Sequence, residues 1–204
     1  MDNMAYLNQI SASNRPAKTS SGPFPFSPKI MIGLGAAIGA IILIIIIGSI
    51  FGGDKNSEQT LVQKLNLRSE NLSRTIEEYN RDVKSSKLRS MGSSLRTVLN
   101  EASSRTSAIL EEDFSSKKTD KKVEESEATY IEEVNTALED AKLNGLLDRV
   151  FVREMTYQIG ILMSMESNIS NKTKKSDLKD FLSGSYSNLE NLYSEFSEYS
   201  DETT

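Results

Sequence analysis

The chain contains an uninterrupted run of 22 uncharged residues at positions 30–51, IMIGLGAAIGAIILIIIIGSIF, in which Ser49 is the one polar side chain. Residues in a helix rise about 1.5 Å each, so this run is long enough to cross a bilayer core of about 30 Å. A secretory signal peptide has a shorter apolar region, of about 7–15 residues, followed by a cleavage site with small residues. Here the run ends in FGGD at residues 51–54. The sequence therefore predicts an uncleaved, single-pass transmembrane helix over residues 30–52.

Basic residues near the two ends of this segment indicate its orientation in the membrane. Three lie on each side: Arg15, Lys18 and Lys29 before it, and Lys55, Lys64 and Arg68 after it. Lys29 directly abuts the apolar run, and the short N-terminal segment is the easier part to retain in the cytoplasm. The prediction is a cell-membrane protein with a cytoplasmic N-terminus and an extracytoplasmic C-terminal domain. The reversed orientation is the alternative.

Two GxxxG patterns lie in the apolar run, Gly35/Gly39 and Gly48/Gly52. Small residues four apart allow two membrane helices to approach closely. At about 100° per residue the two pairs fall on different faces of a helix, so they form no continuous seam. Gly35 and Gly39 are the candidate contact with another transmembrane helix.

Residues 1–29 are polar, carry prolines and show no hydrophobic period, which predicts a disordered tail. The segment 23–28, PFPFSP, alternates proline and phenylalanine just before the span. Phenylalanines fit the membrane interface, where aromatic side chains are enriched. A proline-rich ligand for a partner domain is the alternative function of this segment.

The distribution of proline and glycine predicts long helices after the span. All four prolines precede residue 29, and four glycines follow residue 53: Gly92, Gly145, Gly160 and Gly184. Because these two residue types are the strongest breakers of regular structure, their scarcity indicates an all-α C-terminal region.

The first helical pattern runs over about residues 57–112, with Asn56 and Gln59 as its expected N-terminal capping pair. Its apolar residues are Leu65, Leu72, Ile76, Tyr79, Val83, Leu88, Met91, Leu95, Val98, Ala102 and Ile109. Their phase slips between Val83 and Leu88, which marks either a stutter in a continuous rod or a hinge. Residues 53–92 are expected to form a helical stalk.

Three further helices are predicted after a loop at 113–121: about 120–143, 146–169 and 176–199. Leu143-Asn144-Gly145 is a helix stop, because glycine can adopt the left-handed cap. The second of the three is the most apolar, which suggests a central position, and Gly160 within it suggests a close helix crossing. The apolar stripe of the third is Leu178, Leu182, Ser185, Leu189, Leu192, Phe196 and Tyr199.

Short connections make consecutive helices antiparallel neighbours. The expected architecture is an up-down bundle of about four helices over residues 93–199, followed by a frayed tail at 200–204. An open coiled-coil array that completes its core by dimerising is the alternative.

Charge and residue usage limit the possible activities. Residues 1–53 hold a net charge of +2 and residues 54–204 a net charge of −7, which together give the chain's −5. An acidic domain without a basic stripe is unsuited to nucleic acid. The chain has no cysteine and no histidine, so it lacks thiol nucleophiles and the usual general base and metal ligand at neutral pH. We expect no enzymatic activity, no cofactor, no metal site and no small-molecule substrate.

Carboxylates are the only candidates for chemistry. Glu124, Glu125, Glu127, Glu132 and Glu133 are expected to form a solvated helix face. The triplet 111–113 (Glu-Glu-Asp) could form a weak divalent-cation site but lacks the ligand spacing of a calcium loop. Lysines 117, 118, 121 and 122 are expected in a solvated loop, unless they face anionic lipid.

These observations predict a non-enzymatic, membrane-anchored helical bundle that displays its C-terminal domain for protein interaction or self-association. Its working surfaces would be the apolar seams of helices 57–112 and 176–199. The alternatives are an accessory subunit of a larger membrane complex, or a membrane-tethered cytoplasmic adaptor if the topology is reversed.

Overall fold

The computed structural model describes residues 57–115 and 119–202, with side chains to residue 199. These residues form five α-helices and no strand, which confirms the all-α prediction. The helices are α3 (Glu58–Tyr79), α4 (Ser86–Phe114), α5 (Lys121–Leu143), α6 (Leu147–Lys172) and α7 (Ser176–Glu202).

The predicted transmembrane helix and its Gly35/Gly39 contact lie outside the described residues, as does the N-terminal tail. Among the helices of residues 57–115 and 119–202, none is both long and apolar enough to cross a bilayer.

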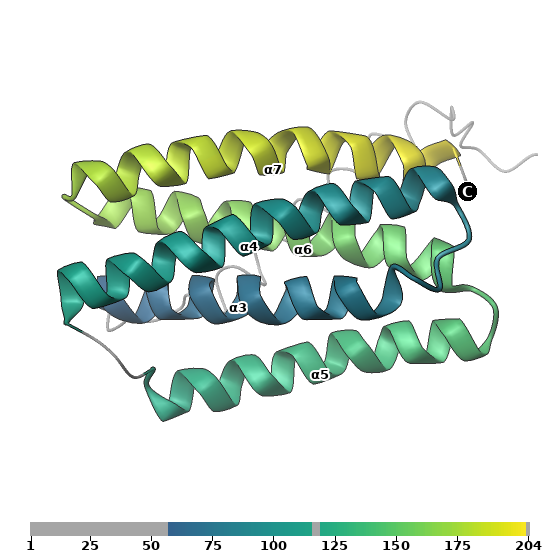
Figure 1. Ribbon diagram of the computed structural model, residues 1–204, viewed down its shortest axis with the longest axis horizontal. Coiled ribbons are helices and arrows are strands. Elements are labelled where there is room, and N and C mark those ends of the chain that lie inside the picture. Colours follow the sequence, from purple (N-terminus) through teal and green to yellow (C-terminus); the bar gives the residue numbers. More distant parts are fainter. Residues whose placement is uncertain (1–56, 116–118, 203–204) are drawn as a thin grey trace, which may run out of the picture. The chain divides into compact units, whose positions relative to one another are not determined.

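Four of the five helices form a ring around the core (Figure 1). In this ring α3 packs against α4, α4 against α7, α7 against α6, and α6 against α3. The remaining helix, α5, packs mainly against α3 and α6 and lies along both of them. The sequence predicts about four bundle helices over residues 93–199, whereas the described residues form five: α3 belongs to the bundle, and α5 is the added helix.

The stalk predicted over residues 53–92 is wrong, because α3 is a core helix. Leu61, Leu65, Leu72 and Ile76 are all at most 1% exposed. A stripe repeating at helical spacing over more than five turns must be covered by other apolar groups. In α3 that cover comes from α4, α5 and α6 of the same chain.

The phase slip between Val83 and Leu88 is a turn, so the hinge alternative is correct. The connection at 80–85 reverses the chain, and α3 and α4 pack side by side. The Ser85 side chain caps α4 by accepting a hydrogen bond from the Leu88 N–H at 3.2 Å. The Asp148 carboxylate accepts the backbone N–H groups of Lys84 and Ser85, each at 2.8 Å, and ties this turn to α6.

Gly92 permits the close approach of α3 and α4 beside this turn. A Cβ atom at this position would lie 2.6 Å from the side-chain oxygen of Asn80 and 3.4 Å from the Phe151 ring. No larger residue fits there without displacing its neighbours. Gly160, for which the sequence predicts a close crossing, is buried on α6 and borders a hollow between α6 and α7.

Two helix ends differ in how well the sequence predicts them. At the start of α3 the capping residue is Ser57 rather than Asn56, with the Thr60 N–H donating to its side chain at 3.2 Å. At the end of α5 the predicted stop is confirmed. Gly145 has φ +71°, and the Leu146 N–H donates to the Ala141 carbonyl at 2.8 Å, which satisfies a carbonyl of the last turn.

The apolar stripes of α6 and α7 are buried within the single chain. Phe151, Met155 and Ile159 of α6 are unexposed, and so is Phe196 of α7. Leu189 and Leu192 are 2% and 6% exposed. Since one chain covers these seams itself, they are not free to bind a partner, and the open array that needs a second copy is not observed.

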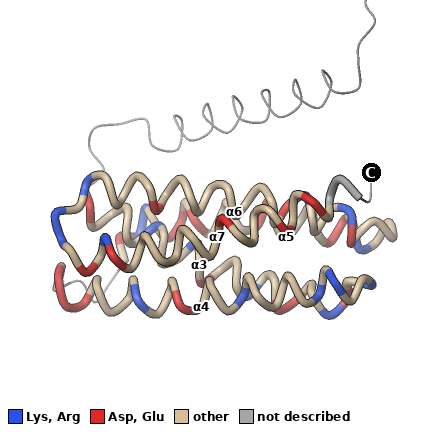
Figure 2. The backbone as a smooth tube through the Cα atoms, turned by 90° about the horizontal axis from the view of Figure 1, so that it is seen from above, with Lys and Arg blue, Asp and Glu red and all other residues tan. Residues whose placement is uncertain are grey.

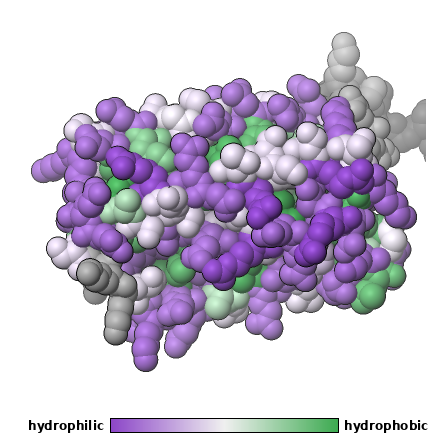
Figure 3. All heavy atoms as spheres, in the orientation of Figure 1, coloured by the Kyte–Doolittle hydropathy of each residue, from purple (hydrophilic) through white to green (hydrophobic). Residues whose placement is uncertain are grey.

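The surface of the bundle is polar. Acidic and basic residues are interspersed along the described helices (Figure 2). The face seen in Figure 3 is mainly hydrophilic, with small, separate apolar patches. The large hydrophobic side chains exposed among the described residues are Leu143, Leu146 and Tyr193.

Candidate functional site

Several polar side chains occupy positions of the core stripes. Arg68 and Glu127 are each 3% exposed, Gln158 and Glu166 are each 1% exposed, and Ser185 is 7% exposed. Burial of a polar or charged group is unfavourable unless it is hydrogen-bonded or paired. These residues form two separate clusters, one at α5 and one between α6 and α7.

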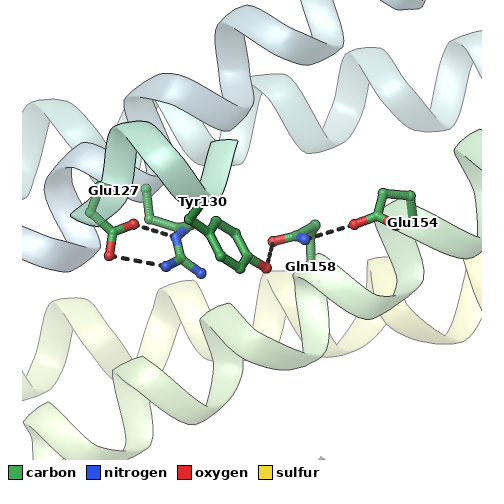
Figure 4. A network of polar contacts seen from close by, with 5 residues as sticks. Glu127, Tyr130, Glu154 and Gln158 are labelled. Carbon is green, nitrogen blue, oxygen red and sulfur yellow. Dashed lines mark hydrogen bonds and ion pairs between the residues drawn. The ribbon is translucent and has the colours of Figure 1, made fainter. Parts of the chain in front are cut away.

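The first cluster joins α3, α5 and α6 (Figure 4). The Arg68 guanidinium of α3 donates to both carboxylate oxygens of Glu127 on α5, from Nε and, at 3.0 Å, from Nη2. It also lies over the ring of Tyr130, 3.5 Å from the ring centroid. The Tyr130 hydroxyl donates to Gln158 Oε1 on α6 at 2.8 Å, and Gln158 Nε2 donates to Glu154 at 2.8 Å.

The electrostatics of this cluster favour a fixed protonation state. Burial raises the pKa of the Tyr130 hydroxyl to about 12, although the nearby Arg68 charge and the Gln158 hydrogen bond oppose the shift. Tyr130 thus stays a neutral donor at physiological pH. The observed contacts of this cluster hold α3, α5 and α6 together.

Two further polar contacts attach α5 to α3. The Thr75 hydroxyl donates to Asn135 Oδ1 at 2.7 Å, and the Tyr79 hydroxyl donates to the Asn135 carbonyl at 3.1 Å. Together with Arg68 and Glu127, these contacts fix the position of α5 along α3.

The second cluster lies between α6 and α7. The Ser185 hydroxyl donates to Glu166 Oε1 at 2.6 Å. The other carboxyl oxygen, Oε2, is buried and has no hydrogen-bonding partner among the described residues. Burial raises the pKa of Glu166 to about 7, and the Ser185 hydrogen bond only partly offsets this effect.

Glu166 borders a surface hollow of about 230 Å³. Its other lining residues are Ser167, Ser170, Asn171, Leu182, Ser183, Tyr186 and Ser187. A second hollow of about 310 Å³ shares Ser167 and Tyr186 with the first and is lined mainly by apolar surface from Gly160, Met163 and Tyr193. A buried carboxyl group with a raised pKa beside a surface hollow is one candidate functional group among the described residues.

The prediction that the glutamates of α5 form a solvated face is confirmed at four positions and is wrong at Glu127. Glu124, Glu125, Glu132 and Glu133 are exposed, but Glu127 is buried against Arg68. The sequence contains a signal for this exception, because Glu127 lies four residues after Val123 and seven before Val134, on the stripe that faces the bundle. Arg68 lies on the stripe of α3 in the same way, between Leu65 and Leu72.

The other candidate residues do not lie together in one site. Glu111, Glu112 and Asp113 are exposed, and Asp113 pairs with Lys175 at 3.2 Å. Among the described residues no three acidic side chains are grouped so that they could hold a metal ion. Lys121 and Lys122 are exposed, while residues 117 and 118 lie outside the described ranges.

Glu166 was absent from the predicted site residues, although its position gives a signal. It lies four residues after Leu162 and three before Ile169, within the apolar stripe of α6. Ser185 is likewise the one serine in the stripe of α7.

Comparison of the chain with protein-family models, with curated proteins and with solved structures finds no match, so the function has to be argued from its own residues.

Proposed function

We propose that this protein is a non-enzymatic, single-pass membrane protein that displays its helical bundle outside the cytoplasm for interaction with a protein partner. The observation that carries the proposal is the uncharged run of 22 residues at 30–51, immediately before the polar bundle. The bundle does not need this segment for its core, because the apolar stripes of residues 57–199 bury one another.

The absence of an enzymatic role is supported by residue usage. The chain has no histidine and no cysteine, and the buried Arg68–Glu127 pair is engaged within the fold. Acid–base catalysis needs a group with a pKa near the working pH beside a positioned reaction partner. Glu166 has a pKa in this range. Its hydrogen-bonded oxygen contacts the Ser185 hydroxyl, which is part of the fold and not a reaction partner.

The proposal is tested by the topology of the full chain in intact cells. With an epitope tag after Thr204, protease added outside should remove the tag, while a cytosolic marker stays intact. Protection of the tag until the membrane is opened, in cells without an outer barrier, would contradict an extracytoplasmic domain and favour the tethered cytoplasmic adaptor. A chain recovered in the soluble fraction would contradict membrane anchoring altogether.

An accessory role in a larger membrane complex is the second candidate, because Gly35 and Gly39 form a small-residue pattern within the span. Replacing both by Ile should then reduce the partners that co-purify with the chain. A matched change of Gly48 and Gly52, which fall on another face, should have little effect. An unchanged set of partners in the first variant would exclude this role for Gly35 and Gly39.

A further inference from the structure

The region around the turn between α3 and α4 has a local charge opposite to that of the whole domain. Residues 54–204 hold a net charge of −7, yet residues 81–96 carry five basic side chains and one acidic side chain. The acidic one, Asp82, already forms an ion pair with Lys142 at 2.9 Å. The basic side chains of this stretch therefore outnumber the carboxylates that it supplies.

Three of these basic residues, Arg81, Arg89 and Arg96, line one surface hollow of about 550 Å³, which we call the arginine hollow. Arg81 follows the end of α3, whereas Arg89 and Arg96 belong to α4. Among the described residues of the lining, Glu77 supplies the one carboxylate, and it pairs with Arg96 at 2.7 Å. The lining thus holds three guanidinium groups and one carboxylate, which gives it a net positive charge.

The other two arginines, Arg81 and Arg89, bond to backbone carbonyls and not to carboxylates within the described residues. Arg81 is exposed and donates from Nε to the Glu77 carbonyl at 3.3 Å. Arg89 is half-buried and donates from Nη1 to the carbonyls of Val83 and Lys84, at 2.7 and 2.8 Å. These carbonyls hold the Arg89 guanidinium at the turn but carry no net charge, so its positive charge stays uncompensated.

Serine hydroxyls add neutral donors to the same lining. Ser86 and Ser90 border the arginine hollow and are exposed. A phosphate group accepts hydrogen bonds on several sides, and arginine is well suited to bind it through two parallel bonds. A carboxylate has only two oxygens and would use fewer of these donors. The combination of uncompensated guanidinium groups with hydroxyls therefore favours a phosphate group over a carboxylate as the ligand.

We propose that the arginine hollow binds a phosphate group, with Arg81 and Arg89 as its charged partners and Ser86 and Ser90 as further donors. Inorganic phosphate and a small phosphate monoester share this chemistry. The inference rests on α3, α4 and the turn between them, and it does not depend on membrane attachment or on display of the bundle to a protein partner.

The test is a calorimetric titration of inorganic phosphate into the full chain in a non-ionic detergent, with titration into detergent alone as the blank. The ionic strength is held constant, which separates specific binding from general screening of surface charge. We expect saturable binding in roughly the millimolar range, as is usual for so small a ligand. Acetate should bind at least about fivefold more weakly.

Two variants with opposite expected effects assign the binding to the arginine hollow. Arg81→Gln removes an uncompensated charge and should weaken phosphate binding by at least about fivefold. Glu77→Gln removes the carboxylate of the lining and frees Arg96 for the ligand, so it should strengthen phosphate binding by at least about threefold. Both side chains are exposed, so neither change should unfold the bundle.

Matched controls make the same changes outside the arginine hollow. Arg105→Gln removes an exposed arginine of α4, and Glu78→Gln removes an exposed glutamate that lies beside Glu77 but about 100° further around α3. Neither side chain lines the arginine hollow. Each control should change the affinity by less than about twofold, because exposed charges at a distance are well screened.

The proposal is overturned if the wild-type chain shows no saturable binding of phosphate or if acetate binds equally well. It is also overturned if Arg81→Gln binds like Arg105→Gln, or if Glu77→Gln binds no more tightly than Glu78→Gln. Glycerol phosphate then identifies the source of the phosphate group. Tighter binding of glycerol phosphate than of inorganic phosphate indicates a small phosphate monoester, whereas equal or weaker binding indicates free phosphate.

Discussion

The four-helix ring and the added helix α5 differ in the balance of apolar and polar contacts that stabilise them. α6 buries twelve residues, ten of them uncharged and apolar or glycine, whereas α5 buries five, of which Glu127 is charged. In the ring, helices associate through continuous apolar stripes, together with polar bonds such as those that Asn66 and Ser73 of α3 donate to α4. α5 adds short apolar contacts and is fixed by Arg68, Asn135 and Tyr130 through specific polar bonds. Apolar burial supplies the larger share of stability, while polar bonds in a fixed geometry determine where the fifth helix lies.

The largest expected effect compares two leucines that are both unexposed, Leu65 on α3 and Leu138 on α5. Leu65→Ala should lower the free energy of unfolding by about 4 kcal/mol, and Leu138→Ala by about 2 kcal/mol, because a site with fewer packed neighbours collapses more readily around the cavity. Chemical denaturation followed by circular dichroism measures both. Leu143→Ala, at a side chain 75% exposed, is the control and should be nearly neutral. Equal losses for Leu65 and Leu138 would show that α5 is as well packed as the ring.

The buried ion pair should give the next largest effect. Glu127→Ala leaves the Arg68 guanidinium buried without its partner and should cost about 3 kcal/mol. The double variant Arg68→Met with Glu127→Leu should recover much of that loss, since it removes both charges. Hydrogen exchange should show faster exchange in residues 121–143 of Glu127→Ala than in α6. Uniformly faster exchange across all helices would contradict a selective loosening of α5.

Glu166 should make the stability of the ring depend on pH. Its pKa of about 7 in the folded chain lies above the unfolded value of 4.5. The contribution of the neutral carboxyl is therefore fully present below about pH 4.5 and is lost as the pH rises to about 7. Glu166→Gln should match the wild type near pH 4.5 and exceed it by up to about 3 kcal/mol at pH 8. Denaturation midpoints measured across this range test the prediction, and a constant difference between the two proteins would show that Glu166 keeps an ordinary pKa.

The smallest effect concerns one neutral hydrogen bond of α5. Thr75→Val keeps the shape of the side chain but removes the donor to Asn135 Oδ1, and should cost about 1 kcal/mol. Thr97→Val is the matched control, because the Thr97 hydroxyl is exposed and bonds only within its own helix. If the two variants lose the same stability, the Thr75–Asn135 bond contributes nothing specific to the docking of α5.

Helix positions followed closely from the sequence. The predicted ranges 120–143, 146–169 and 176–199 agree with α5, α6 and α7 to within three residues at each end. Local signals explain this success, since Gly145 and the periodic leucines act over one or two turns. The phase slip between Val83 and Leu88 also located the turn between α3 and α4, although the sequence left open whether it was a stutter or a hinge.

The candidate site was much harder to predict than the helices. Arg68, Glu127, Gln158 and Glu166 each lie at a core position of their stripe, but a stripe does not show which residue another helix places opposite it. Glu127 meets a guanidinium and Glu166 meets a hydroxyl only because of how α3, α5, α6 and α7 pack.

The sequence by itself determined the positions of α5, α6 and α7 and an uncharged run long enough for a membrane helix, because these depend on the order and spacing of neighbouring residues. Tertiary structure decided that residues 58–79 belong to the core rather than to a stalk, that α5 is the added helix, and that Glu166 has no counter-charge among the described residues. These features depend on contacts between residues far apart in the chain, such as Arg68 with Glu127 and Glu166 with Ser185. They are fixed only when the whole bundle has minimised its exposed apolar surface and paired its buried polar groups.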